Sequence, residues 1–192
     1  MKLRLAFPYL LHRFTSKNRH GLHSPFVYKL LDEVIYDRSP KKAYANLKNI
    51  TKILPADGNR KNSLRVNQLL YRLVQFLQPA NLGIATNVNN VTVQYLQLAA
   101  PKARLINCDQ TPNPPGAPPC FVWDAHSVVI HAETLQPNTV IILTNIHIDA
   151  AANITWQLLK ANPNTTVSID LFWIGLAFNR PGQVKEHFKL RF

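Results

Sequence analysis

From residue 81 onward, short apolar runs alternate with longer runs of helical spacing, and this alternation limits the fold more than any other feature of the chain. The apolar runs are rich in β-branched residues, which suits strands that are buried on both faces of a parallel sheet. We expect such strands at 82–85, 104–108, 120–124 and 139–146. Helical spacing predicts helices at 90–100 and 149–162. Alternating strands and helices predict an α/β fold with a mostly parallel sheet.

The last part of the chain departs from this alternation. Residues 166–178 and 184–192 have the pattern of two long strands, and Arg180-Pro181-Gly182 lies between them. Because Pro and Gly favour a turn that reverses the chain, we expect a C-terminal antiparallel hairpin on the otherwise parallel sheet. Asp170 alternates with apolar neighbours in the first of these strands, and we expect it to pair with a Lys or Arg on the opposite strand.

Residues 1–78 have helical patterns and hold most of the positive charge. Helices are expected at 26–37, 42–54 and 63–77, the first preceded by Ser24-Pro25 as N-cap and first-turn proline. The length of 192 residues fits one globular domain with an extension. We therefore expect a basic helical N-terminal segment at 1–78 and one α/β domain at 79–192.

The net charge of +12 is concentrated at the front of the chain. Residues 1–65 hold 14 Lys and Arg against 4 Asp and Glu, a net charge of +10. Such an excess indicates an acidic partner, such as nucleic acid or an anionic surface, and the alternative is a solvated helical face. Because no run approaches the roughly 20 apolar residues needed to cross a bilayer, we expect no membrane insertion. With Cys108 and Cys120 interpreted as free thiols, the expected localisation is cytoplasmic.

Four stretches resemble a known family: HGLHSPFVYKLLDEVIYD (20–37), LLYRLVQFLQP (69–79), VSIDLFWIGLAF (167–178) and KEHFKLRF (185–192). They are similar to a small bacterial branch of the class I S-adenosylmethionine-dependent methyltransferases, whose members have a helical N-terminal segment. The resemblance implies a Rossmann-like fold, S-adenosylmethionine as the cofactor, and transfer of its methyl group to an oxygen or nitrogen acceptor.

The same resemblance places the cofactor loop directly after the first strand. In the family this strand ends in an acid and a Gly-rich turn follows; here the acid falls on Ile84 and the glycines on Thr86 and Asn90. Glycine lets the backbone approach the cofactor closely, which the β-branched Thr86 prevents, whereas Asn90 tolerates positive φ. Asp109 matches the acid that binds the ribose hydroxyls. The implied cofactor residues are thus Thr86, Asn90, Asp109 and Asp124, in a site that has lost much of its pattern.

Asp124 ends a strand, and in related O-methyltransferases the matching Asp is a metal ligand. After the next strand the family has two acids, where this chain has Thr144 and Asn145. The resemblance implies a remnant polar site of Asp124, Asn145 and His147, in which Asp124 or His147 would be the base of an active enzyme. No metal is expected, because Thr144 is a poor ligand for a hard divalent cation; a remnant metal site would keep Asp124 and Asn145. The alternative is that these residues cap strand ends. Only 14 residues, rich in Pro, separate Asp109 from Asp124, so the family's third strand is expected to be missing, which exposes a sheet edge.

Three functions remain open at this point, and whether the chain is an enzyme is not decided. The favoured one is a methyltransferase-family protein with a degraded cofactor site, which keeps the fold for binding or assembly. The first alternative is an active methyltransferase on a small molecule or other acceptor. The second is a binder of nucleic acid or an anionic surface through the basic N-terminal helices. The exposed sheet edge and the apolar hairpin also suggest a homodimer.

Overall fold

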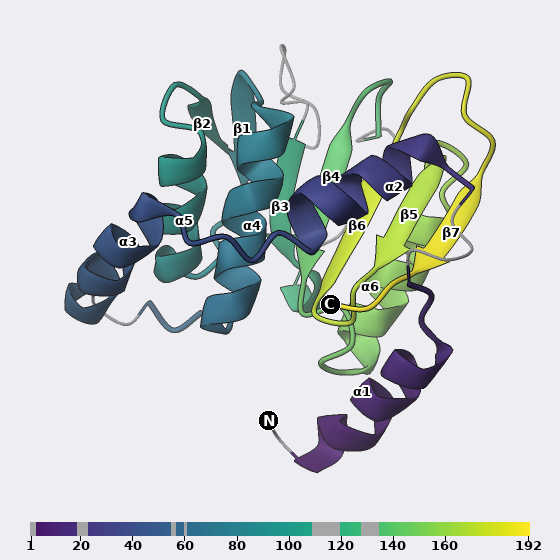
Figure 1. Ribbon diagram of the computed structural model, residues 1–192, viewed down its shortest axis with the longest axis horizontal. Coiled ribbons are helices and arrows are strands. Elements are labelled where there is room, and N and C mark those ends of the chain that lie inside the picture. Colours follow the sequence, from purple (N-terminus) through teal and green to yellow (C-terminus); the bar gives the residue numbers. More distant parts are fainter. Residues whose placement is uncertain (1–2, 19–22, 55–56, 60, 109–119, 128–134) are drawn as a thin grey trace.

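The computed structural model describes residues 3–18, 23–54, 57–59, 61–108, 120–127 and 135–192. Within them, seven strands form one mixed sheet in the order β2-β1-β3-β4-β6-β5-β7 (Figure 1). The strands are β1 (Asn81–Ile84), β2 (Arg104–Asn107), β3 (Cys120–Asp124), β4 (Val140–Thr144), β5 (Val167–Asp170), β6 (Ile174–Phe178) and β7 (Glu186–Lys189). The helices are α1 (Leu3–Thr15), α2 (Pro25–Leu30), α3 (Lys42–Ile53), α4 (Leu64–Leu77), α5 (Asn90–Ala99) and α6 (Ala150–Ala161).

The first four strands, β2, β1, β3 and β4, run parallel to one another. Each of these strands and the helices α3 to α6 lie where the sequence pattern predicted them, within a residue or two. The predicted cap of α2 is also present, because the Ser24 side chain accepts from the Val27 amide. The expected helix at 26–37 continues from α2 into a widened π-helical turn, Leu31–Ile35. The α/β class with a mostly parallel mixed sheet is confirmed.

The C-terminal hairpin is present, but the predicted strands and turn are wrong. The chain reverses inside 166–178, so that β5 and β6 are antiparallel neighbours, with Asp170 opposite Gly175. The Asp170 carboxylate accepts from the Phe172 amide at 2.9 Å, and Phe172 has a φ of 70°. This side-chain hydrogen bond to the backbone two residues on makes a tight turn, which residues 171–173 do not signal because they include neither Pro nor Gly. β7 then pairs with β5 in parallel rather than antiparallel orientation.

Helices cover both faces of the sheet, and side chains alternate between two cores. On one face, α2 and α4 pack over strand residues such as Leu82, Val122 and Ile142 (Figure 1). On the other face, α6 covers residues such as Phe121 and Leu143. Helices before the expected boundary at 78/79 therefore share one core with the strands after it.

At the edges of the sheet, β2 is the outermost strand among the described residues on one side and β7 on the other. The expected loss of a third strand concerns residues 109–119, which lie outside the described residues. Beyond β7, Lys17 forms an isolated parallel bridge with Leu190, which connects the end of α1 to this edge. None of the described helices has the length and apolar character required to cross a membrane.

Candidate functional site

A pocket of about 780 Å³ opens at the carboxyl ends of β1, β3 and β4. This is the edge at which open α/β sheets bind ligands. Its sheet side is lined by Asn87, Asp124, His126, Asn145, Ile148 and Trp173. The helical N-terminal segment closes the opposite side with Leu5, Gly58, Asn59, Lys61, Asn62, Ser63 and Val66. Two residues predicted from the sequence, Asp124 and Asn145, therefore share one pocket.

The Asp124 carboxylate is buried and is satisfied by donors from this chain. Its Oδ2 accepts from Asn145 Nδ2 at 2.5 Å and from the Thr144 hydroxyl at 3.3 Å. Its Oδ1 accepts from the His126 amide at 3.0 Å. A hard divalent metal ion needs oxygen ligands. Asn145, however, has its amide nitrogen and not its amide oxygen next to the Asp124 carboxylate. The arrangement is a hydrogen-bonded pair that joins the ends of two neighbouring strands.

Asn87 connects the loop after β1 to the end of β3. Its Nδ2 donates to the Asp124 carbonyl at 3.1 Å, and its Oδ1 accepts from the Asp124 amide at 3.2 Å. One side-chain amide thus continues the hydrogen-bond ladder between β1 and β3. Sequence reasoning missed Asn87, and its only signal was the Asn-rich turn at 87–90.

The expected cofactor residues Thr86 and Asn90 have structural roles. The Thr86 carbonyl accepts from Asn59 Nδ2 at 2.7 Å, and Asn90 begins α5. Asn90 is not among the described residues with positive φ, so it does not use the tolerance for this conformation that its residue type has. Neither residue belongs to the pocket lining that the described residues form. The fourth expected cofactor residue, Asp109, lies outside the described residues.

Asp57 holds the start of α5. Its carboxylate accepts from the Asn90 amide, from Asn89 Nδ2 at 2.8 Å and from the Asn59 amide at 3.0 Å. Burial by itself would raise the pKa of Asp57, but these hydrogen bonds to the charged form outweigh it and hold the pKa below the ordinary value of 3.8.

Asp57→Ala is expected to lower the free energy of unfolding by about 1–2 kcal/mol near neutral pH, because three donors, two of them at the start of α5, lose their acceptor. A carboxylate with a depressed pKa stabilises the fold fully above its unfolded pKa and loses this contribution as pH falls through the folded pKa. The difference between the two proteins should therefore shrink below about pH 4. Urea unfolding of both across this range measures it, and a pH-independent difference would contradict it.

His147, the second predicted base, forms its described hydrogen bonds away from Asp124. Its Nε2 lies 2.8 Å from Asp170 Oδ2, and its Nδ1 accepts from Asn153 Nδ2 at 2.9 Å. His147 is also absent from the pocket lining formed by the described residues. The predicted partner of Asp170, a Lys or Arg, is wrong: Lys189 lies opposite Asp170, but its Nζ donates to the Thr15 hydroxyl.

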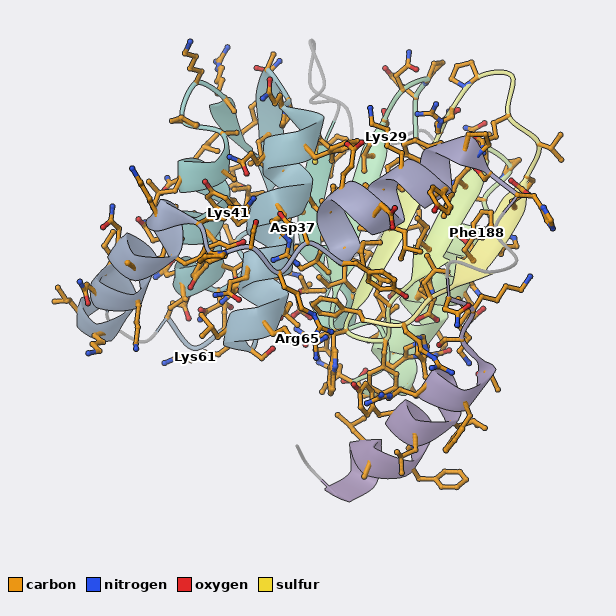
Figure 2. The ribbon with its side chains drawn as sticks, in the orientation of Figure 1. Lys29, Asp37, Lys41, Lys61, Arg65 and Phe188 are labelled. Atoms are coloured by element: carbon orange, nitrogen blue, oxygen red, sulfur yellow. The ribbon has the colours of Figure 1, made fainter. Side chains whose placement is uncertain are left out.

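A second pocket, of about 730 Å³, has a strongly basic lining. We call it the arginine pocket, because Arg13, Arg38, Arg65, Arg72 and Arg191 line it. Its single acidic side chain among the described residues, Asp37, is bound by Lys41 Nζ at 2.8 Å, a hydrogen bond that lowers the pKa of Asp37. Figure 2 shows Asp37 beside α4, whose first turn carries Arg65.

Comparisons with known proteins leave the geometry as the main guide to function. The chain matches no protein-family model, and it has no match among curated proteins.

Proposed function

We propose that the chain is a class I S-adenosylmethionine-dependent methyltransferase-family protein in which the residues at the cofactor crevice now serve to hold the ends of two strands together. In this proposal the protein keeps a Rossmann-like fold for binding or assembly and does not transfer methyl groups. The observation that supports it most is the Asn87 amide, which hydrogen-bonds both backbone groups of Asp124 at the crevice between β1 and β3.

Two further observations agree with this proposal. The loop after β1 is fixed from outside the sheet by Asn59 and Asp57, so its backbone groups already have protein partners. The Asp124 carboxylate, which would serve as a base, accepts three hydrogen bonds from this chain. A general base needs a free acceptor within hydrogen-bond distance of the proton it removes. The polar groups on the sheet side of this pocket are therefore paired with one another, which fits a structural role better than a cofactor site.

Calorimetric titration tests the proposal. We expect no binding heat above dilution when the full chain is titrated with S-adenosylmethionine or S-adenosylhomocysteine up to about 1 mM, which corresponds to less than about 4 kcal/mol of binding free energy. The control is Asn87→Ala, which removes the side chain that joins β1 to β3 and should not restore binding, because Thr86 and Ile84 remain. A micromolar dissociation constant for the wild-type chain would contradict the proposal.

A second candidate function, binding of single-stranded nucleic acid, is favoured by the arginine pocket. Arg72 is buried, with its Nε donating to the Val34 carbonyl at 2.8 Å, and Arg191 Nε donates to the Arg13 carbonyl at 3.1 Å. These hydrogen bonds fix two of the five guanidinium groups in place. Arg65 lies over the Phe192 ring, 4.7 Å from its centroid. Fixed cations beside aromatic rings are the combination that holds phosphates and bases of single strands.

Fluorescence anisotropy with a labelled single-stranded RNA tests this candidate. Arg65→Ala and Arg38→Ala should each weaken binding and reduce the slope of log affinity against log salt by about 0.7, because each removes one phosphate contact. Lys102→Ala is the matched control, since Lys102 is exposed, has the same charge and lies outside the arginine pocket. Equal effects of all three substitutions would show that the binding is not located in this pocket.

A further inference from the structure

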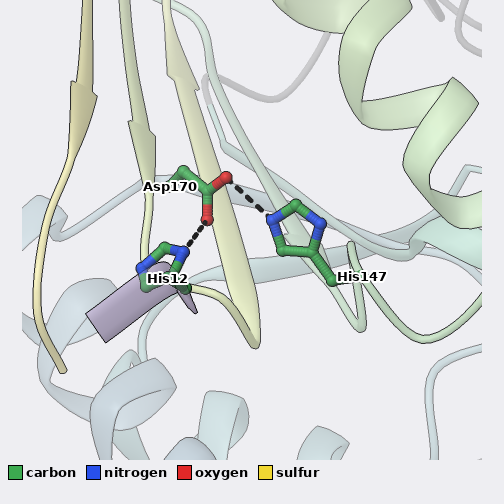
Figure 3. A group of neighbouring side chains, drawn as sticks. All are labelled: His12, His147 and Asp170. Atoms are coloured by element: carbon green, nitrogen blue, oxygen red, sulfur yellow. Dashed lines mark hydrogen bonds and ion pairs between the residues drawn. The ribbon is translucent and has the colours of Figure 1, made fainter. Parts of the chain in front are cut away.

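Three side chains from distant parts of the chain meet beside the sheet. His12 comes from α1, His147 follows β4, and Asp170 ends β5 (Figure 3). One ligand atom of each lies within 4.8 Å of the others. None of the three belongs to the lining of the 780 Å³ pocket among the described residues. The cluster is therefore separate from the site of Asp124 and Asn145.

His12 presents an unused nitrogen to this cluster. The side chain is buried, with 3% of its surface exposed, and its Nε2 donates to the Leu190 carbonyl at 3.1 Å. In the neutral ring this assigns the proton to Nε2, so that Nδ1 carries a lone pair. Nδ1 has no hydrogen-bond partner in the described part of the chain, and it lies 3.5 Å from Asp170 Oδ1. A lone pair and a carboxylate oxygen thus face each other, which calls for a cation between them.

We propose that His12 Nδ1, His147 Nε2 and the Asp170 carboxylate bind one divalent transition-metal ion, and that Zn²⁺ fits them best. Two imidazoles and one carboxylate are a usual ligand set for zinc, with a fourth position left for water. Zinc bonds of about 2.0 Å in a tetrahedron separate ligand atoms by roughly 3.3 Å. The present separations are 2.8 Å from Asp170 Oδ2 to His147 and 3.5 Å from Asp170 Oδ1 to His12. Because the three ligand atoms lie within 4.8 Å of one another, adjustments of at most about 1.5 Å bring them to this spacing.

A proton is the competing cation between His12 and Asp170, and the distance between these two side chains disfavours it. A charge-assisted hydrogen bond between a protonated imidazole and a carboxylate is about 2.7–2.9 Å long, whereas His12 Nδ1 lies 3.5 Å from Asp170. A metal ion between the two atoms would satisfy both.

The groups behind the ligands hold them in place. The Nε2–H group of His12 donates a hydrogen bond to the Leu190 carbonyl, as the second ring nitrogen of metal-binding histidines commonly does. His147 has the Asn153 side chain against its other nitrogen, and rotation of this amide lets it accept from an Nδ1–H. Asp170 accepts from the Phe172 amide at 2.9 Å and from Trp156 Nε1 at 3.4 Å. The bound ion would attach α1 to the ends of β4 and β5.

The test uses the full chain, treated with a chelator, dialysed, and titrated with Zn²⁺ by calorimetry and with Co²⁺ by visible absorption. We expect one ion per chain, a dissociation constant below about 1 µM, a rise of several degrees in Tm with excess Zn²⁺, and the intense bands of four-coordinate cobalt. Absence of Zn²⁺ binding, or of any rise in Tm, would overturn the proposal.

Three variants locate the ion. His12→Gln and His147→Gln should each weaken Zn²⁺ binding by at least about 100-fold, since each removes a ligand. His187→Gln is the matched control, because His187 is exposed and pairs with Ser168 outside the cluster, and it should leave the affinity unchanged. If His12→Gln fails to fold, the partly exposed His147 decides the question. Equal affinities of His147→Gln and His187→Gln would overturn the proposal.

Discussion

Trp156→Ala is expected to lower the free energy of unfolding by about 3–5 kcal/mol, the largest loss that we predict for a single substitution. The side chain has 0% of its surface exposed and lies in the core between α6 and the sheet, together with Phe121 and Leu143. Its removal would leave a cavity that neighbouring side chains cannot fill. The loss of its Nε1 hydrogen bond to Asp170 adds to the effect. Urea unfolding followed by far-UV circular dichroism measures it.

Two further variants separate the causes of this loss. Leu158→Ala lies on the same helix, but 66% of its side chain is exposed, so its effect should stay within about 0.5 kcal/mol. Trp156→Phe keeps most of the ring volume and removes the Nε1 donor, and it should cost clearly less than Trp156→Ala. If Leu158→Ala and Trp156→Ala were equally destabilising, burial of the indole ring would not be the cause, and helix propensity could not explain it either, because alanine is the best helix former.

Gly175→Ala is expected to destabilise the fold by about 1–3 kcal/mol, although it adds only one methyl group. A Cβ at Gly175 would lie 2.7 Å from two ring carbons of Trp156 and 3.1 Å from Ile146 Cγ2. Both neighbours are completely buried, so the ring has no free space into which it can move. Glycine is needed in this strand for close approach of the indole ring, and the measurement is again urea unfolding.

The two substitutions should not be additive. In a Trp156→Ala background, the methyl group added at residue 175 lies in the space that the indole ring has left. Gly175→Ala should then lower the free energy of unfolding only slightly or even raise it. A coupling free energy of about 1 kcal/mol or more is expected from the four proteins of this cycle. Full additivity would show that Gly175 is required for a reason other than contact with Trp156.

Much of the fold could be predicted because it depends on local patterns. Apolar runs of strand length and helical periodicities predicted strands β1 to β4 and helices α3 to α6, since neither signal needs long-range information. The turn at Leu171–Trp173 could not be predicted in this way. It depends on the Asp170 carboxylate and on a bulky residue, Phe172, at positive φ, a conformation that its residue type disfavours.

The candidate site could likewise be predicted only in part from the sequence. Asp124 and Asn145 could be placed together because the carboxyl ends of adjacent parallel strands meet at one edge of the sheet. His147 was assigned to the same edge, but it turns toward Asp170, which only the position of β5 explains. The contribution of His12 could not be foreseen, because it depends on where α1 packs against the other end of the chain.

The most direct test of the central claim, that protein hydrogen bonds hold the loop after β1 to the end of β3 and leave no cofactor site there, is amide hydrogen exchange with single-residue resolution. The Asn90 amide is bound by Asp57 and the Asp124 amide by Asn87. Both amides should therefore be protected in the free protein, and millimolar S-adenosylhomocysteine should leave their exchange unchanged. Rapid exchange at these amides that slows when the ligand is added would contradict the account and would show a working cofactor site.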